Sequence, residues 1–409
     1  MNETQRTHDN STHTTTTNTT QQNTHDNENN ETMENNTTAH TERPELTTTW
    51  GPKPTTPRPA NTIRIIFQNV NGIPMDDTLC IDLFSLAEAL EPSLLGLAET
   101  KLDCKKYERT IAPLRSRLNR IWKSNKMTIT DSTDQISNTS TYKPGGVMQI
   151  ATGPICARIQ TPENDKRCGR WTAQTLLHPD GMKSIYYTVY RVCKTTLQAA
   201  GETTAWKQQW RIQRNQGVVN PNPRTLFLSE LKTEVQNKRT QNYEVFIMGD
   251  FNTPIWDTEL QEFLHDCELF DLHEPCATHW TTPPTFKNGS TKIDHMFGTY
   301  RFLEATVSAS ILSWEASLPG DHRCLVIDLC QRKLNATCDD LTTPSHQRLI
   351  SNSPRKAKKY RDKAMELTEK SKIQQRLDTL NAKCKRQGKA LPPDDRQLAK
   401  IDNEMTGYM

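Results

Sequence analysis

The chain has 409 residues, of which 33% are hydrophobic and 24% are charged, and its formal net charge is +3. This length can hold two average domains or one large α/β domain with extensions. No apolar run approaches the roughly 18 residues that span a membrane, and the polar N-terminus lacks the hydrophobic stretch of a signal peptide, so the composition argues against a membrane-spanning or secreted protein and predicts a soluble, intracellular one, nuclear or cytoplasmic.

Residues 1–60 have too little apolar surface to fold. They contain 19 Thr and 9 Asn and hardly any aliphatic residue, and such a segment cannot offset the entropy lost when a chain becomes ordered. Its last part, from Thr47 to Pro59, contains four prolines, which favour extended backbone. We therefore predict a disordered Asn/Thr-rich tail and a proline-rich linker, with folded structure beginning near Asn61.

Residues 61–330 alternate between β-rich apolar runs and stretches with the period of a helix. The pattern predicts helices at Ile81–Leu90 and Thr225–Lys238, a helical or irregular segment up to Trp122, and a polar loop around residues 131–140. Many short strands combined with several helices favour layered sheets flanked by helices over a purely parallel βαβ fold. The predicted strands are Ile63–Phe67, Leu94–Ala98, Gly146–Ala151, Thr172–Leu177, Ile185–Val192, Val245–Met248, Lys292–Phe297, Thr306–Ile311 and Cys324–Leu329.

Residues 331–409 are predicted to form a basic, largely helical extension. Ser353 and Pro354 suit the N-cap and first position of a helix, and the next 30 or so residues are rich in Lys, Glu, Gln, Leu and Ala, so one long basic helix is predicted. The two prolines after Leu391 break it. A second helical stretch then runs to Met409 without a stop signal, so we expect this extension to lead into, or to adjoin, a further protein region.

Charge is distributed unevenly along the chain. The net charge is −4 over residues 1–60, −1 over residues 61–330 and +8 over residues 331–409. A near-neutral body with a basic extension suits a polyanionic partner. A solvated charged helix needs no partner, and the charge alone leaves both interpretations open.

The eleven cysteines are scattered and odd in number. None belongs to a CxxC pair of the kind that binds zinc. Free thiols in a reducing compartment are the simplest interpretation.

Five short polar clusters each lie at the end of an apolar strand, where sheets present catalytic groups. Acidic groups at strand ends can gather in one cleft and hold Mg²⁺. Singly, each cluster has an ordinary explanation, because Asn and Asp beside Gly form turns, Glu-Thr-Lys can begin a helix and Asp-His occurs on surfaces. Their joint order is more specific. The clusters are Gln68-Asn69-Val70-Asn71-Gly72, Glu99-Thr100-Lys101, Gly249-Asp250-Phe251-Asn252, Lys292-Ile293-Asp294-His295 and Gly320-Asp321-His322.

The segments QNVNG, LAETK, GGVMQIA, VYR, IMGDFN, PTFKNGSTKIDH and GDHRCLVIDL resemble, in order and spacing, the motifs of the endonuclease/exonuclease/phosphatase superfamily, which includes pancreatic-type deoxyribonucleases and abasic-site endonucleases. The resemblance covers residues 61–330. Within the superfamily, GDFNTP and KIDHMFG look most like the endonuclease domains of non-LTR retrotransposons and related reverse-transcriptase polyproteins. The resemblance implies an α/β fold, a four-layer sandwich of two β-sheets flanked by helices.

The resemblance also implies a metal site and a base. Glu99, Asp321 and Asn69 match the residues that hold Mg²⁺ against a phosphate oxygen, with Mn²⁺ as the alternative cation, and Asn69 also counts among the catalytic residues. Asp250 matches the aspartate that orients or deprotonates the attacking water, and Asn252 would hold phosphate or water through its amide. The ordinary alternatives are a helix cap for Glu99 and an Asx-turn for Asp250 and Asn252.

The resemblance also implies a second group of residues, which match those that contact the scissile phosphate. Asp294 matches the aspartate that pairs with a histidine, here His322, and orients its imidazole. Tyr190 matches a tyrosine whose hydroxyl approaches the phosphate, although a buried strand tyrosine is also a common core residue. Thr285, which precedes an aromatic residue, and Asn71 are expected to contact the substrate.

The chain departs from the superfamily pattern at three positions. Gly320 replaces a Ser that often precedes the Asp-His pair, which removes one phosphate contact worth about 1 kcal/mol. Cys324 replaces a Pro that often follows the pair. Val192 replaces the Pro of the Tyr motif, which affects the stiffness of the loop more than the chemistry.

Together these features predict a metal-dependent phosphodiester hydrolase, a DNA-nicking endonuclease of retroelement origin whose partners are the DNA phosphate backbone and a reverse-transcriptase region encoded downstream. The alternatives are a phosphomonoesterase or an RNA nuclease on the same fold. An inositol phosphatase is disfavoured, because Phe251-Asn252-Thr253 differs from the Asn-Tyr-Arg that follows Gly-Asp in that branch. A catalytically decayed retroelement fragment is a further alternative, against which the intact candidate residues argue.

Overall fold

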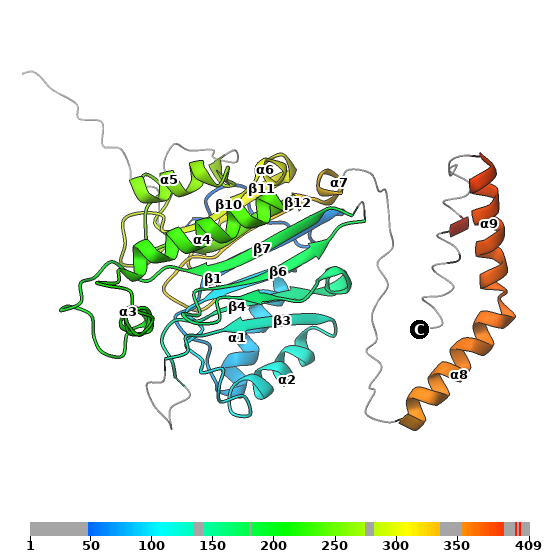
Figure 1. The fold of residues 1–409 in the computed structure, drawn as a ribbon, viewed down its shortest axis with the longest axis horizontal. Coiled ribbons are helices and arrows are strands. Elements are labelled where there is room, and N and C mark those ends of the chain that lie inside the picture. The colour runs from blue at the N-terminus through cyan, green and yellow to red at the C-terminus, as the bar shows by residue number, and fades with distance from the viewer. Residues whose placement is uncertain are drawn as a thin grey trace, which may run out of the picture. The chain divides into compact units, whose positions relative to one another are not determined.

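The computed structural model describes residues 48–134, 142–179, 181–274, 282–335 and 354–387, together with residues 397, 398 and 401. Within these ranges the chain forms two six-stranded mixed β-sheets that carry helices on their outer faces (Figure 1). The four-layer α/β sandwich that we predicted is confirmed. Residues 1–47, which include most of the predicted tail, lie outside the described residues.

The first sheet has the strand order β11-β12-β1-β2-β4-β3. Its central strands β1 and β2 are parallel, and its other neighbouring strands are antiparallel. The strands are β1 (Thr62–Asn69), β2 (Leu94–Ala98), β3 (Asn125–Thr130), β4 (Val147–Thr152), β11 (Thr306–Ile311) and β12 (Leu325–Cys330).

The second sheet has the strand order β5-β6-β7-β8-β10-β9. Here β7 and β8 form the parallel pair, again at the centre of the sheet. The strands are β5 (Glu163–Asn164), β6 (Trp171–Leu177), β7 (Lys183–Tyr190), β8 (Tyr243–Asp250), β9 (Phe270–Asp271) and β10 (Asp294–Gly298).

Helices cover the outer faces, with α1 and α2 on one side of the strands and α4 and α5 on the other (Figure 1). Helix α4 begins two residues before the predicted Thr225, because Asn222 caps it and Pro223 occupies its first turn. The helices are α1 (Asp77–Ala89), α2 (Ile111–Ile121), the 3₁₀ helix η1 (Gly153–Arg158), α3 (Ala205–Asn215), α4 (Pro223–Thr240), α5 (Thr258–Asp266), α6 (Tyr300–Ala305), α7 (Gln331–Leu334), α8 (Pro354–Lys370) and α9 (Ile373–Gln387).

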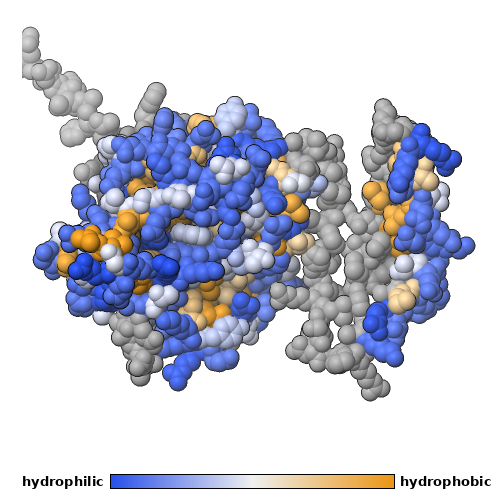
Figure 2. Space-filling model, in the orientation of Figure 1, coloured by the Kyte–Doolittle hydropathy of each residue, from blue (hydrophilic) through white to orange (hydrophobic). Residues whose placement is uncertain are grey.

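Apolar residues of the central strands fill a core on each side of their sheet. Successive side chains of a strand point to opposite faces; thus Phe67 of β1 packs in the core between the sheets, whereas Ile66 packs against α1 and α2. In β8, Met248 faces the core between the sheets and Ile247 faces α4 and α5. Both faces of these strands are buried, so they appear in the sequence as continuous apolar runs. The surface seen in Figure 2 is correspondingly mostly hydrophilic.

The two sheets approach closely at Gly96. A Cβ atom at this position would lie 2.7 Å from the Cε atom of Met248 and 2.8 Å from Oγ1 of Thr188, which is closer than packed atoms allow. Glycine at this point of β2 therefore lets the parallel pairs of the two sheets lie against each other.

Each predicted strand is present with its ends within two residues of the prediction. The sequence patterns did not reveal the polar edge strand β3 or the short strands β5 and β9. Helices α3 and α5 were also missed. These elements acquire their structure by packing against the sheets, since little in their own pattern marks them.

Folded structure begins earlier than predicted. Trp50 is 5% exposed and pairs with Ile311 of β11 through two backbone hydrogen bonds of 2.9 and 3.0 Å. The boundary near Asn61 was therefore wrong, because the proline-rich segment includes an aromatic residue that covers the edge of the first sheet.

The predicted long basic helix was also wrong, because the structure has two helices there, α8 and α9. Lys372, between them, has φ +52°, a left-handed conformation that ends a helix. The helical stretch predicted beyond Leu391 lies outside the described residues except at three positions.

Among the described residues, no helix is both long and apolar enough to cross a membrane. Nine of the eleven cysteines lie in the described part of the chain, and all nine are free thiols, as predicted.

Candidate active site

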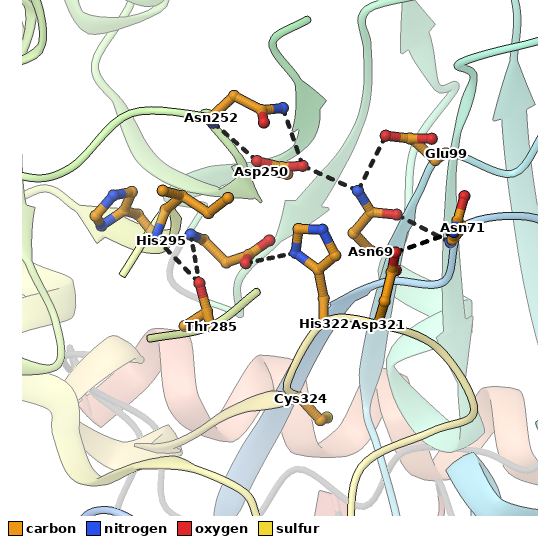
Figure 3. A network of polar contacts seen from close by, with 12 residues as sticks. Asn69, Asn71, Glu99, Asp250, Asn252, Thr285, His295, Asp321, His322 and Cys324 are labelled. Carbon is orange, nitrogen blue, oxygen red and sulfur yellow. Dashed lines mark hydrogen bonds and ion pairs between the residues drawn. The ribbon is translucent and has the colours of Figure 1, made fainter. Parts of the chain in front are cut away.

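The candidate residues converge at one end of the two sheets. Asn69 is the last residue of β1, and Glu99 follows the parallel neighbour β2. In the second sheet, Asp250 ends β8 and lies opposite Asp294, the first residue of the antiparallel strand β10. Strand ends that were distant in sequence thus present their side chains to one another (Figure 3).

Asn69 links the two sheets through its side-chain amide. Its Nδ2 atom donates hydrogen bonds to Oδ2 of Asp250, at 2.9 Å, and to Oε1 of Glu99, at 3.3 Å. Its Oδ1 atom accepts from the backbone N–H of Asn71. Asn69 is 1% exposed, so these contacts fix the two carboxylates around a single buried amide (Figure 3).

The Asx-turn expected as the ordinary alternative is present at Asp250, and it also carries Asn252 into the site. Oδ1 of Asp250 accepts a 2.8 Å hydrogen bond from the backbone N–H of Asn252. The side-chain amide of Asn252 donates to Oδ2 of Asp250, at 3.1 Å, and to the carbonyl of Arg191. The turn and the functional interpretation are therefore compatible, because the turn aims both side chains at the same place.

Asp294 and His322 form a buried pair. Nδ1 of His322 lies 2.8 Å from Oδ2 of Asp294, and the two residues are 6% and 0% exposed. The ring of Phe286 lies 5.0 Å from the imidazole, centre to centre. This arrangement fixes the orientation of the ring and leaves Nε2 as the nitrogen available to a substrate.

Thr285 is fully buried, and its hydroxyl oxygen accepts hydrogen bonds from the backbone N–H groups of Ile293 and Asp294, at 3.0 and 3.1 Å. The substrate contact expected of Thr285 stays a prediction; in this structure its hydroxyl oxygen accepts two backbone hydrogen bonds. It holds the start of β10 and thereby positions Asp294.

Asn71 and Asp321 meet at the exposed rim of the site. Nδ2 of Asn71 donates a 3.1 Å hydrogen bond to Oδ2 of Asp321 (Figure 3). The ammonium group of Lys101 contacts Oδ1 of Asn71 and lies 3.4 Å from Oε2 of Glu99. Lys101 belongs to the Glu99 motif, but the sequence alone gave it no role.

Tyr190 ends β7 in register with Asp250. Its side chain is buried, and its hydroxyl interacts with Glu99. Burial, and secondarily the charges of Glu99 and of neighbouring groups, raise the pKa of Tyr190 well above its ordinary value, so the phenol stays protonated and can donate a hydrogen bond.

The loops that carry these residues are strained. Glu99 and Lys101 have φ values of +49° and +56°, and Asn71 and Asn252 have +50° and +49°. Residues other than glycine rarely adopt this left-handed conformation. Backbone hydrogen bonds from Thr100 and Lys101 to the Gly145–Gly146 turn hold the Glu99 loop in place, and strain maintained in this way is typical of functional sites.

The electrostatics of the site are dominated by buried carboxylates. Burial, followed by the charge of Asp294, raises the pKa of Asp250 to about 8. Burial by itself would lower the pKa of His322, but Asp294, and secondarily Asp250 and Asp321, raise it to about 10. At neutral pH the imidazole is therefore a cation, and Asp250 can gain or lose a proton close to neutrality.

The donor atoms at the site suit a hard divalent cation. Oδ1 of Asp294 and Oδ1 of Asp321 are buried and have no hydrogen-bond partner in the protein, and oxygen ligands are those that Mg²⁺ and Mn²⁺ prefer. Asp250, Asp294 and His322 also place one potential ligand atom each within 4.8 Å of one another. The carboxylates thus fit a cation. Of the predicted ligand set, Asn69 contacts both Glu99 and Asp250, and Asp321 contacts Asn71.

The departures from the superfamily pattern leave this cluster intact. Cys324 is fully buried in the core beneath α1 and α2, and its side chain lies apart from the polar network (Figure 3). Val192 is buried in the core between the sheets. Both substitutions therefore place apolar or weakly polar groups in packed regions.

Sequence reasoning missed three residues around Asn252. The thiol of Cys193 lies 3.2 Å from Oδ1 of Asn252. The guanidinium of Arg224 donates to the carbonyls of Val192 and Asn252, and that of Arg191 donates to Oγ1 of Thr253. Arg191 is the last residue of the VYR segment, and Cys193 lies two residues after it. Arg224 approaches Asn252 through the packing of α4.

No protein-family profile matches the chain, and no curated protein is similar to it in sequence. Solved structures with a similar fold include the catalytic domain of human Nocturnin with bound sulfate, with 18% sequence identity over 68% of this chain and 96% of that one and a TM-score of 0.46. The AP endonuclease LMAP from Leishmania major has 13% identity over 66% of this chain and 89% of its own, with a TM-score of 0.48. A 3′ phosphatase, NExo from Neisseria, bound to a product DNA hairpin, has 18% identity over 65% and 99% of the two chains and a TM-score of 0.43.

Proposed function

We propose that the chain is a divalent-metal-dependent phosphodiesterase of the endonuclease/exonuclease/phosphatase type that nicks DNA. The observation that carries the proposal is the meeting of two hydrogen-bonded groups, one of Asn69, Glu99 and Asp250 and the other of Asp294 and His322, whose potential ligand atoms on Asp250, Asp294 and His322 lie within 4.8 Å of one another. Structural carboxylates in a core are normally paired with cations. Here several carboxylates gather with few protein cations, which is the arrangement that a phosphate–cation site needs.

Glu99 and Asp321, with Asn69 beside them, would hold Mg²⁺ or Mn²⁺. The bound cation would supply charge neutralisation at a non-bridging oxygen of the phosphate. The buried Oδ1 of Asp321 supports this assignment, because it lacks a partner within the protein.

Asp250 is the group that would accept the proton of the attacking water. Its pKa of about 8 lies close to neutral pH, where a general base is most effective. As the oxygen of water forms a bond to phosphorus and the ester P–O bond breaks, the proton of water would pass to the carboxylate of Asp250, and the departing ester oxygen would take up a proton from solvent and leave as an alcohol. The amides of Asn69 and Asn252 hold that carboxylate in one orientation.

His322 would face the phosphate with its charged imidazole. Asp294 orients the ring through Nδ1, and the resulting cation stabilises the negative charge that develops on the phosphate oxygens. Tyr190 and Asn71 would add neutral hydrogen bonds at opposite sides of the same phosphate.

DNA is the proposed substrate because the motifs resemble retroelement endonucleases and because residues 331–409 carry a net charge of +8, which favours a polyanion. The test is a plasmid-nicking assay on the full chain, with Mg²⁺ and with EDTA. We expect wild-type protein to convert supercoiled plasmid to the open circle only with the cation, and Glu99→Gln to lose at least about 100-fold in rate.

Glu262→Gln, an exposed carboxylate on α5, is the matched control and should behave as wild type. Equal nicking by wild type and Glu99→Gln would show a contaminating nuclease and overturn the proposal. Cleavage of structured RNA or of a phosphomonoester in place of plasmid would select the alternative substrates, and inactivity on all three would indicate a decayed fragment.

The retroelement origin is a separate proposal. It rests on the GDFNTP and KIDHMFG segments and on the basic extension. It predicts that the coding sequence immediately downstream encodes a reverse transcriptase in the same frame, and unrelated sequence there would contradict it.

A further inference from the structure

A pocket of about 350 Å³ adjoins the candidate site on the side of Lys101. It lies between the loop after β1 and the loop after β2, and Tyr142, which precedes β4, completes its lining. Its lining includes Asn71, Ile73, Met75, Lys101, Leu102 and Tyr142. Two of these residues, Asn71 and Lys101, also contact the carboxylates of the candidate site.

Backbone hydrogen bonds hold the pocket open in a fixed shape. The N–H of Ile73 donates to the carbonyl of Thr100, at 3.0 Å, and the N–H of Lys143 donates to the carbonyl of Lys101, at 2.9 Å. Lys143 is itself 3% exposed and forms an ion pair of 3.0 Å with Asp131. The three segments that form the walls are therefore tied to one another and to the core, so the pocket is preformed.

The pocket has an apolar base and an aromatic rim. Ile73 and Leu102 are 5% and 2% exposed and belong to the core beneath α1 and α2. Tyr142, which also lines the pocket, is 55% exposed and pairs with Leu102 through a β-bridge. A flat, largely apolar group with polar edges fits such walls, since it can stack on the phenol and cover the aliphatic side chains.

The position of the pocket limits what such a group can be. Oδ2 of Asp321 is 3.1 Å from the amide of Asn71, and Oε2 of Glu99 is 3.4 Å from the ammonium of Lys101. A phosphate at these carboxylates would therefore lie beside the pocket, because Asn71 and Lys101 contact the carboxylates and also line the pocket. In a nucleic acid strand, each phosphate is followed by a nucleotide that carries one base. A base in a duplex is stacked between its neighbours and cannot enter a walled pocket.

We propose that this pocket binds the unpaired nucleobase of the nucleotide next to the cleaved phosphate, and that the preferred substrate is therefore single-stranded or locally unpaired DNA. The proposal rests on the proposed phosphodiesterase function. Lys101 then contacts both the phosphate and the base, because its ammonium lies at the carboxylates and its aliphatic stem lines the pocket.

The test compares binding of two oligonucleotides of equal length and charge, a short oligothymidylate and the same backbone with base-free tetrahydrofuran spacers. Binding to the full chain is measured by fluorescence anisotropy in EDTA, so that no hydrolysis occurs. We expect wild type to prefer the base-bearing strand by about 10-fold, since stacking on an aromatic side chain contributes on this scale.

Tyr142→Ala should lose that preference and bind the base-free strand as wild type does, whereas Tyr142→Phe should retain it. Tyr300→Ala, which removes a tyrosine of similar exposure on α6, is the matched control and should change neither affinity. Equal affinity of wild type for the two strands, or an unchanged preference in Tyr142→Ala, would overturn the proposal.

The nicking assay separates this inference from the proposed function. A base preference that depends on Tyr142, in a protein that cleaves no phosphodiester, would support the nucleobase pocket and contradict the proposed phosphodiesterase function. Metal-dependent nicking with no base preference would support the proposed phosphodiesterase function and contradict the nucleobase pocket.

Discussion

The side-chain amide of Asn69, at the end of one sheet, donates a 2.9 Å hydrogen bond to the carboxylate of Asp250, at the end of the other. The two residues are 181 positions apart. This contact joins the halves of the sandwich at the point where the candidate base lies. The amide of Asn69 favours the charged form of Asp250, but burial and the charge of Asp294 outweigh it, so the pKa of Asp250 is raised to about 8.

Replacing Asn69 should therefore impair catalysis more than folding. We expect Asn69→Ala to lower kcat for plasmid nicking by about 100-fold or more, the usual effect of removing one oriented donor from an active site. The midpoint of urea unfolding should change little in comparison. Asn237→Ala, on the exposed face of α4, should leave both quantities unchanged; a similar loss of activity in that variant would show that the assay reports general damage.

The Asp294–His322 pair predicts a specific pH dependence. The pKa of His322 is raised from its ordinary value of 6.5 to about 10, so the charged imidazole stabilises the folded state fully below pH 6.5, and this contribution is lost as the pH rises through about 10. In Asp294→Asn the main cause of the increase is absent. We expect its activity to fall with rising pH within the neutral range, where wild-type activity still depends on His322 being charged.

The measurement is the pH profile of kcat/KM together with an NMR titration of the His322 ring. His265→Gln, at an exposed histidine on α5, serves as the control. An unaltered titration of His322 in Asp294→Asn would contradict the assignment of the pair.

A buried ion pair behind the site should govern stability in acid. Burial by itself would raise the pKa of Asp271, but Lys292, 2.8 Å away, holds it well below its ordinary value of 3.8. Because the pKa of Asp271 is depressed, the pair stabilises the folded state above about pH 3.8, and this contribution disappears as the pH falls through the depressed pKa. Asp271→Asn should destabilise the protein at pH 7 by about 3 kcal/mol, because it leaves Lys292 buried and unpaired.

Urea unfolding of wild type and Asp271→Asn at several pH values tests this expectation, and the difference between them should shrink in acid. Asp266→Asn removes the carboxylate of a more exposed pair with Lys232 and should have a much smaller effect. A difference that stays constant down to the lowest pH would contradict the role given to Asp271.

Cys193 offers a chemical test of the position of Asn252. Its thiol is exposed and contacts Oδ1 of Asn252. Desolvation, and next the carboxylates of Asp250 and Glu99, raise its pKa to about 11, so it should react slowly with methyl methanethiosulfonate at neutral pH and faster in alkali. The attached group would crowd Asn252, and we expect nicking to fall as modification proceeds.

Cys193→Ser keeps a hydrogen-bond donor and should retain activity and resist the reagent. Cys193→Ala should lose activity mainly in kcat, by less than about 10-fold. Inactivation of Cys193→Ser at the wild-type rate would assign the effect to another thiol.

The sequence predicted most of the candidate site because its residues lie in short motifs at strand ends. Glu99 and His322 could be identified in this way, since Glu99 directly follows the apolar strand β2 and His322 shortly precedes the apolar strand β12. Arg224 and Cys193 could not, because they reach Asn252 through packing across 28 and 59 positions. Thr285 was assigned to the substrate because a motif gives a residue type and a place in the chain, and it does not show whether a hydroxyl is already occupied by backbone donors.

The sequence by itself determined nine of the twelve described strands, the helices α1 and α4 and the identity of the polar residues at the strand ends, because alternation of side chains, caps and turns act over a few neighbouring residues. Only the tertiary structure decided that Asn69 meets Asp250, that Trp50 covers the first sheet and that Tyr142 closes a pocket beside Lys101. These contacts depend on how the two sheets pack and on which loops they bring together. The way the sheets pack depends on the burial of apolar side chains throughout the molecule, so no short segment of sequence determines it.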